Sequence, residues 1–178
     1  QLSSLNPISS HDLTRIATEL KENIKLLKLV IAFQITYVGS PMIYYGDEVG
    51  MTGGKIEQRR APMIWDEDKR DMDLFDWYKK LIKIRKNNIA LQLGDFKLLG
   101  KGVATNTYSF IRKKNNNLLL MIFHNSRLST KLKFDLQDIS TEATKFKELI
   151  SNQEYVVENG KIIVSVEEYS VNILRAEY

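Results

Sequence analysis

The chain has 178 residues, of which 43% are hydrophobic and 10% aromatic, enough for one medium or two small domains with buried cores. It contains no cysteine, which excludes disulfides and thiolate metal sites, and with two histidines we expect no transition-metal site or cofactor. Its formal charge of +4 comes from 26 basic and 22 acidic residues that are scattered along the chain. A surplus this small predicts no nucleic-acid partner.

The longest apolar stretch, residues 26–38, is interrupted by Lys28, Gln34 and Thr36. It is too short and too polar to cross a bilayer, so we expect no membrane partner. No charged and apolar leader opens the chain, which begins at Gln1. We therefore expect a fragment or a processed product with a cytoplasmic location, and an extracellular location stays open.

The first half alternates between strand and helix patterns. Residues 5–8 are expected to end a strand, and apolar residues spaced near four predict one long amphipathic helix over 16–35. Residues 41–45 predict a buried strand, 46–71 a long loop with about one helical turn, and 73–86 a second helix with an apolar face. This order is typical of parallel βα units.

The expected boundaries of the long helix rest on individual residues. Asp12 or Thr14 is suited to cap its start, Asn23 marks an expected kink, and Gly39 is expected to end it.

Beyond residue 90 the pattern changes to short alternating runs separated by turn residues, which predicts an antiparallel β-sandwich. The fold class is therefore α/β followed by all-β, with domains at 1–92 and 93–178. The expected strands are 96–99, 105–112, 118–124, 131–134, 145–150, 155–157, 161–166 and 171–176.

His11 and Asp12 follow the first expected strand. A carboxylate beside a histidine at the C-terminal end of a parallel strand is a common catalytic arrangement in barrel enzymes. An N-cap role for Asp12 with a solvated His11 is the simpler explanation, and composition alone favours it.

Two further motifs carry possible chemistry. The strand over 41–45 leads to Asp47 and Glu48, and adjacent strand residues face opposite sides, so at least one is expected to pair with a buried arginine or with backbone N–H groups. In the loop at 59–66, Arg59 and Arg60 could pair with carboxylates. Trp65 could stack on a sugar ring, but packing of Trp65 and Met63 that anchors the loop is slightly favoured. His124 and the Trp77–Tyr78 stripe are expected to be structural.

Taken together, these segments resemble the α-amylase family of glycoside hydrolases. Residues 5–16, with Ser10-His11-Asp12, resemble the segment after its seventh barrel strand, residues 39–51 its eighth strand, and 60–65 the following loop. The resemblance is greatest to neopullulanases, cyclomaltodextrinases and maltogenic amylases. It implies the last βα units of a TIM barrel followed by a C-terminal β-sandwich.

The resemblance also implies roles for residues. Asp12 would be the carboxylate that stabilises the transition state, and the other roles fall into two sets. Substrate binding is expected of His11, Arg15, Tyr45 and Trp65, and support of the site of Asp47, Glu48 and Arg60.

The sequence departs from the family pattern at two places. Leu13-Thr14 replaces the usual Thr-Pro, which puts the shape of the turn in question, and Ile56-Glu57 replaces a common Asp-Pro in the loop.

The family's nucleophile and acid/base carboxylates lie on earlier strands. The implied parent is a retaining hydrolase of α-1,4 and potentially α-1,6 bonds in maltooligosaccharides or cyclodextrins, with calcium binding by that parent left open. We expect this chain alone to be inactive and to self-associate through exposed barrel edges. The alternative is a non-catalytic carbohydrate-binding or interaction module.

Overall fold

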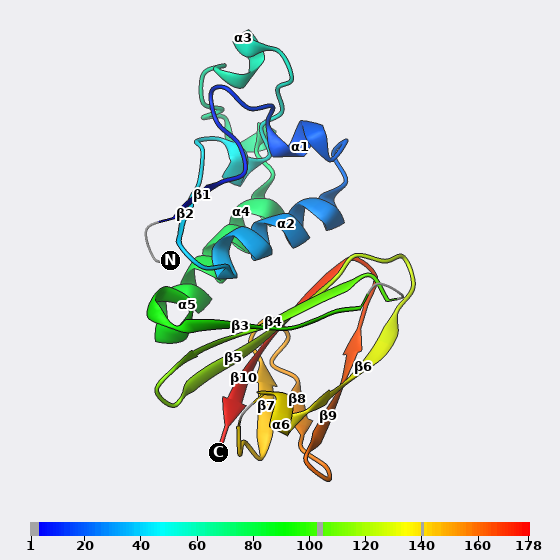
Figure 1. Cartoon of the computed structure of the whole chain (residues 1–178). Helices are drawn as coiled ribbons and strands as arrows, with labels where there is room; N and C mark the ends of the chain where they lie inside the picture. Colours follow the sequence, from blue (N-terminus) through cyan, green and yellow to red (C-terminus); the bar gives the residue numbers. More distant parts are fainter. Residues whose placement is uncertain (1–3, 103–104, 140) are drawn as a thin grey trace. The chain divides into compact units, whose positions relative to one another are not determined.

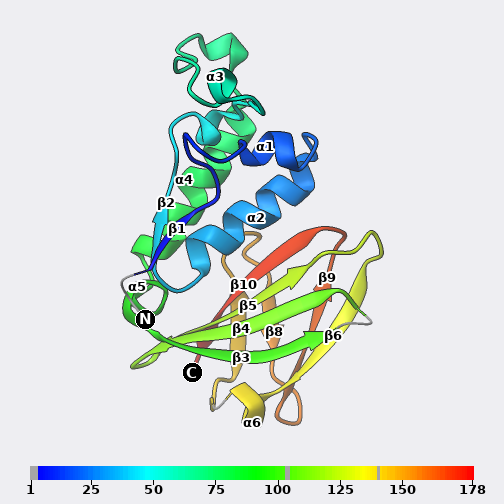
Figure 2. The ribbon, with the colours of Figure 1, turned by 45° about the horizontal axis from the view of Figure 1, so that its top comes forward.

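The structure is a computed structural model that describes residues 4–102, 105–139 and 141–178 (Figures 1 and 2). The chain divides into two compact units, Gln1–Arg85 and Lys86–Tyr178. The expected boundary after residue 92 falls inside helix α5 (Ile89–Leu93), which belongs to the second unit. Each unit is described by itself below.

The first unit contains a parallel pair of strands, β1 (Leu5–Pro7) and β2 (Ser40–Met42). Gln34 ties the two together, because its Nε2 donates to the carbonyls of Asn6 and Met42 at 2.9 and 2.8 Å. Gly39 is required beside them: its φ is +101°, and a Cβ there would lie 2.5 Å from the Ser4 carbonyl oxygen. Strand β2 ends at Met42, so the strand expected over 41–45 is shorter than predicted, and the residues of β2 are not fully buried.

The single long helix predicted over 16–35 is wrong. Two helices form instead, α1 (Ile16–Glu19) and α2 (Ile24–Thr36). Lys21 and Glu22 between them adopt left-handed φ values of 52° and 57°, which a continuous α-helix does not allow. The expected kink residue, Asn23, is the N-cap of α2, where its side chain accepts a hydrogen bond from the Leu26 N–H.

Helix α4 (Met72–Lys86) confirms the helix expected over 73–86. Its buried face contains Leu74, Tyr78, Leu81 and Ile84, while Trp77 is half-buried and donates from Nε1 to the Lys28 carbonyl at 3.0 Å. The long segment before it contains three single-turn elements: η1 (Asp47–Val49), α3 (Ile56–Arg59) and η2 (Glu67–Lys69).

Arg85, near the end of α4, fixes the C-terminal end of α2. Its Nη1 donates to the Ile35 carbonyl and its Nη2 to the Gly39 carbonyl, both at 2.6 Å. Helix α2 ends at Thr36, three residues before the glycine expected to end it.

The second unit is antiparallel throughout its described strands, and all eight predicted strands are present. A six-stranded sheet has the order β3-β4-β5-β10-β7-β8, and β6 pairs with β9 in a second sheet. The strands are β3 (Asp95–Gly102), β4 (Thr107–Lys114), β5 (Asn117–His124), β6 (Thr130–Asp135), β7 (Lys145–Glu148), β8 (Glu154–Val156), β9 (Lys161–Val166) and β10 (Ser170–Glu177).

The core of this unit follows from strand alternation. On β9, Ile162, Val164 and Val166 are buried and alternate with less buried residues, as expected of a strand with one covered face. These side chains belong to one hydrophobic cluster with residues of β5, β7 and β10. A short helix, α6 (Leu136–Ile139), adds two further residues to the cluster.

His124 has a structural position at the end of β5. It is buried, and its Nδ1 lies 2.7 Å from the Glu167 carbonyl oxygen. In the described part of the chain no helix is both long and apolar enough to cross a membrane.

Candidate active site at the ends of two parallel strands

Two loops leave the C-terminal ends of β1 and β2, and they carry the residues expected to act on substrate. The first loop is shaped by two serines. Ser9 Oγ accepts from the Ile16 N–H at 2.9 Å, and Ser10 Oγ accepts from the N–H groups of Asp12 and Leu13, both at 3.1 Å. These bonds fix the turn that presents His11 and Asp12.

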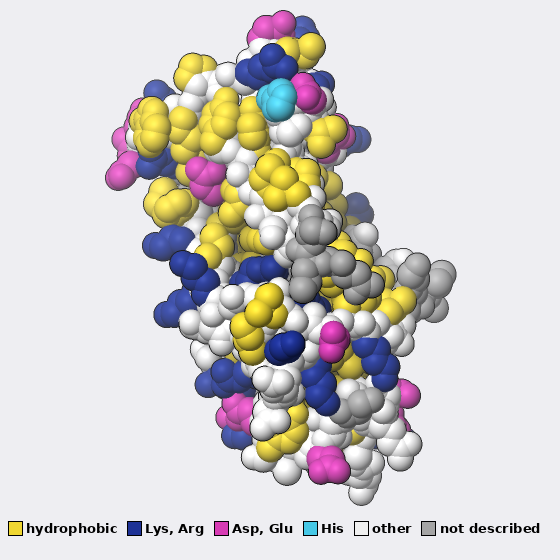
Figure 3. Space-filling model, turned by 60° about the vertical axis from the view of Figure 1, so that its left-hand side comes forward, with side chains coloured by type: hydrophobic (Ala, Val, Ile, Leu, Met, Phe, Trp, Pro, Cys, Tyr) yellow, Lys and Arg dark blue, Asp and Glu magenta, His cyan; other side chains and the backbone are white. Residues whose placement is uncertain are grey.

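His11 and Asp12 form an exposed pair. The His11 Nε2 lies 3.0 Å from Asp12 Oδ2, and the two side chains are 61% and 70% exposed. Asp12 does not cap a helix, because the N-cap residue of α1 is Arg15, whose side chain makes no capping hydrogen bond. In Figure 3 a histidine is visible at the surface with basic and acidic side chains next to it. The carboxylate is therefore open to a ligand from solvent.

Two consecutive arginines of the second loop hold this turn. Arg60 Nη2 lies 3.2 Å from Asp12 Oδ1, and Arg59 Nη1 donates to the Asp12 carbonyl at 2.8 Å. Arg59 also donates from Nε to the Gly54 carbonyl at 2.8 Å. The expected supporting role of Arg60 thus has a physical basis. Both arginines were candidates for pairing with a carboxylate: Arg60 pairs with Asp12, whereas Arg59 bonds the backbone carbonyls of Asp12 and Gly54.

Arg15 does not have the position expected of a substrate-binding residue. It is fully buried, and its Nη1 donates to Asp47 Oδ1 at 3.0 Å and to the Tyr45 carbonyl at 2.7 Å. Its Nη2 donates to the Arg59 carbonyl at 3.1 Å. A guanidinium enclosed in this way cannot reach a sugar, so the prediction for Arg15 is wrong. It joins the two loops from inside.

Asp47 has the buried arginine partner that was expected for one of the two adjacent acids. Burial raises the pKa of the Asp47 carboxyl, and the Ser9 hydrogen bond and the Arg15 charge oppose this without cancelling it. Burial likewise raises the pKa of Tyr78, with the nearby acids Asp47 and Glu48 adding to the effect. One oxygen of each acid and the Tyr78 hydroxyl are buried without a hydrogen-bond partner.

A shallow apolar pocket of about 470 Å³ lies beside these groups. Its lining includes Tyr45, Glu48, Met63 and Trp65. Trp65 is 76% exposed, which overturns the favoured expectation that it packs to anchor its loop. Tyr45 is 40% exposed, its hydroxyl donates to the Ala61 carbonyl at 2.7 Å, and the Arg15 guanidinium lies over its ring, 5.0 Å from the centroid. Both aromatic side chains are thus partly open to solvent, and Trp65 is the more exposed of the two.

The arrangement offers one exposed carboxylate beside an imidazole, together with two aromatic side chains that are partly open to solvent. Asp47 is enclosed and bonds Arg15, so it is not open to substrate as a second carboxylate beside Asp12. A retaining glycosidase holds two such groups about 5–5.5 Å apart. In the described part of the chain, no three His, Cys, Asp or Glu side chains group to hold a metal ion.

Comparison with known proteins adds an independent finding. Residues 3–71 match the family model "Alpha amylase, catalytic domain". A cyclomaltodextrinase of a Bacillus species is 38% identical over 122 residues, covering 68% of this chain and 22% of that protein. One from Geobacillus thermopakistaniensis (strain MAS1) is 30% identical over 174 residues, covering 98% of this chain and 29% of that protein.

A solved cyclomaltodextrinase structure superposes with a TM-score of 0.91 at 27% identity, covering 98% of this chain and 30% of its own. The chain therefore spans less than a third of the length of each of these relatives.

Proposed function

The chain belongs to the α-amylase family of glycoside hydrolases, and on that premise we propose that it supplies the transition-state-stabilising part of a retaining α-glucan hydrolase. In this family, the first unit corresponds to the last two βα units of the TIM barrel and the second to the C-terminal β-sandwich. The proposed substrates are maltooligosaccharides or cyclodextrins, in keeping with the names of the related cyclomaltodextrinases.

The observation that carries the proposal is the exposed Asp12 carboxylate, oriented by Arg60 and adjoining His11. A fixed negative charge at the end of a barrel strand is suited to stabilise the positive charge that develops on a sugar ring during cleavage. Its two oxygens are also suited to accept hydrogen bonds from vicinal hydroxyls. Trp65 and Tyr45 would then contact the apolar face of a neighbouring glucose.

Because Asp47 is enclosed, and because the family's nucleophile and acid/base carboxylates lie on earlier barrel strands, we propose that the 178-residue chain by itself does not cleave glucans. The purified chain is expected to release no reducing sugar from maltotriose or β-cyclodextrin. Measurable hydrolysis by the chain alone would contradict this.

The decisive experiment places the chain in a complete framework. Residues 1–178 replace the matching segment of the Geobacillus cyclomaltodextrinase, with which they align over 174 residues. The chimera is expected to hydrolyse β-cyclodextrin, and Asp12→Asn is expected to lower kcat by on the order of 10²- to 10³-fold, as removal of one transition-state-stabilising group does.

Glu168→Gln, at an exposed acid of the second unit, serves as the matched control and should leave kcat unchanged. A folded chimera that is inactive, or one whose activity survives Asp12→Asn, would overturn the proposal.

The alternative function is a non-catalytic carbohydrate-binding or interaction module. The exposed Trp65 and Tyr45 favour it, because they offer stacking faces that need no cleavage chemistry. This alternative predicts that the chain alone binds maltotriose, that Trp65→Ala weakens the binding, and that the chimera shows no hydrolysis. The proposed function predicts activity of the chimera, so the same two measurements separate the two.

A further inference from the structure

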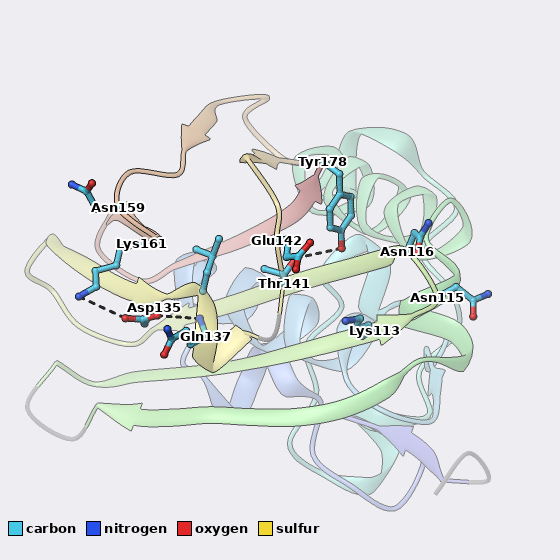
Figure 4. A pocket seen from close by; sticks show the side chains of 12 residues that line it. Lys113, Asn115, Asn116, Asp135, Gln137, Thr141, Glu142, Asn159, Lys161 and Tyr178 are labelled. Atoms are coloured by element: carbon cyan, nitrogen blue, oxygen red, sulfur yellow. Dashed lines mark hydrogen bonds and ion pairs between the residues drawn. The ribbon is translucent and has the colours of Figure 1, made fainter.

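The second unit contains a large open pocket that the proposed reaction does not use. Its volume is about 910 Å³, within the range of pockets that hold small ligands. The lining comes from three parts of the fold: the turn between β4 and β5, the segment from the end of β6 through α6 to Glu142, and the turn before β9. Tyr178 follows the end of β10 at the same pocket (Figure 4).

The charges of the lining are balanced. The lining contains two lysines, Lys113 and Lys161, and two acids, Asp135 and Glu142, and Lys161 Nζ lies 3.6 Å from Asp135 Oδ2. A pocket with equal numbers of cationic and anionic side chains gives little net attraction to an anion or a cation. The balance therefore favours a neutral ligand.

The remaining polar groups are amides and hydroxyls. Asn115, Asn116, Gln137 and Asn159 are exposed, and each amide group can both donate and accept hydrogen bonds. Tyr178 is 63% exposed, and its hydroxyl accepts from Thr141 Oγ1 at 3.4 Å, so the hydroxyl proton stays free for an acceptor. Neutral groups that act as donor and acceptor at once match the hydroxyls of a sugar, and the Tyr178 ring offers an apolar face.

Turn geometry explains part of this asparagine content but not all of it. Asn115 and Asn159 have φ values of 51° and 50°, a left-handed conformation that asparagine tolerates better than most residues. Asn116 has no positive φ, so the backbone does not require an asparagine there. Gln137 likewise lies in helix α6 and its amide has no conformational role to fill.

We propose that this pocket is a second carbohydrate site, which binds a neutral oligosaccharide without cleaving it. Amide groups at its two turns would bind hydroxyls, Glu142 would accept from a vicinal pair of them, and the Tyr178 ring would stack on a sugar face. The choice of an α-glucan as the probe rests on the proposed function. The site itself rests on the chemistry of the lining.

The test is a titration of the isotope-labelled 178-residue chain with maltotriose, followed by amide NMR signals. The chain carries Trp65→Ala, so that binding near Asp12 does not obscure the result. The backbone and side-chain amides of the pocket are expected to shift in a saturable way. Asn115→Gly and Asn159→Gly keep a residue that accepts the left-handed turn while removing the amide group, and each should weaken binding about two- to tenfold, the effect of losing one neutral hydrogen bond.

Asn152→Gly is the matched control, because Asn152 also has a left-handed φ, of 66°, but lies outside the pocket. It should leave the affinity unchanged. Absence of shifts at the pocket overturns the proposal, as does equal binding by the Asn115→Gly and Asn159→Gly chains. Shifts caused by inorganic phosphate but not by maltotriose also overturn it, because they indicate an anion site on the two lysines.

Failure of the proposed function is a separate result. An inactive chimera together with maltotriose shifts at this pocket removes the hydrolase proposal and leaves the second site in place. An active chimera without these shifts does the reverse.

Discussion

At the scale of single residues, the surroundings of each arginine decide what it contributes. Arg15 is fully buried and bonds Asp47, while Arg60 is 53% exposed in its side chain and bonds Asp12. Removing one partner of a buried ion pair leaves the other charge buried and unpaired, which strongly lowers the free energy of unfolding. An ion pair on the surface contributes little to that free energy. The two loops are therefore joined by Arg15, and Arg60 adjusts the position of one carboxylate.

This difference gives a matched prediction. Arg15→Met should lower the free energy of unfolding of the first unit by about 3–5 kcal/mol, because Asp47 loses its buried partner. Arg60→Met should cost at most about 1 kcal/mol. Both can be measured by urea unfolding followed by tryptophan fluorescence, since Trp65 and Trp77, the chain's two tryptophans, lie in this unit. Equal losses for the two variants would refute the assignment of Arg15.

The raised pKa of Asp47 predicts a pH dependence. Because the folded state holds this proton more tightly than the unfolded chain does, the free energy of unfolding should fall as pH rises from the ordinary carboxyl range through the raised pKa. Asp47→Asn removes the titration, so the stability of the wild-type chain relative to this variant should decline over that interval.

Melting curves of both chains from about pH 3 to 8, the range in which perturbed carboxyls titrate, would measure this decline in relative stability. Thr52→Ser, at an exposed position of the same unit, is the control and should show no such trend, because neither hydroxyl side chain titrates in this range. A constant difference between the wild type and Asp47→Asn would contradict the pKa direction.

The positions of Asp12, His11 and Arg60 followed from local motifs and their resemblance to a family, and the structure brings these three together. Arg15 could not be placed from sequence, because its burial depends on Asp47, 32 residues away. The exposure of Trp65 was missed for a related reason, since a tryptophan in a loop has the same local pattern whether it packs or stays open.

At the scale of elements, prediction from sequence succeeded where the alternation of apolar and polar residues extended over enough residues to identify the element. The eight strands of the second unit were visible from alternation and from turn residues such as Asn159-Gly160. The short helices α5 and α6 were missed, because four or five residues are too few to show a helical period. The break between α1 and α2 was missed as well, since apolar spacing continued across Lys21 and Glu22 although their backbone does not.

Helix α2 begins where Asn23 caps it, and this gives a prediction for an element. Asn23→Ala should lower the free energy of unfolding by about 1 kcal/mol, within the range of about 0.5–2 that loss of an N-cap produces, because the Leu26 N–H loses its acceptor. Asn23→Ser retains a capping oxygen and should restore most of the loss. Equal destabilisation by both changes in urea unfolding would show that the cap is not the cause.

At the scale of the whole molecule, the two units differ in how completely they cover their strands. The second has a six-stranded sheet with a cluster of buried residues, whereas the described part of the first has two strands of three residues. Short strands with uncovered edges contribute little stability by themselves and offer backbone groups to other chains. Leu5, on β1, is 60% exposed, and Leu13 in the first loop and Ile56 at the start of α3 are exposed by more than half.

This contrast predicts two unfolding steps. Tryptophan fluorescence, which reports the first unit, should change at a lower urea concentration than the far-ultraviolet circular dichroism of the strands, most of which belong to the second unit.

The uncovered edges of β1 and β2 should also cause self-association, visible as a sedimentation coefficient that rises with protein concentration. Leu5→Lys, at an exposed position of β1, should reduce that rise, because a charge on an edge strand opposes pairing with another chain. Coincident transitions in a chain that stays monomeric would mean that the first unit is stabilised by contacts beyond its own strands, and that the edges are not free to pair.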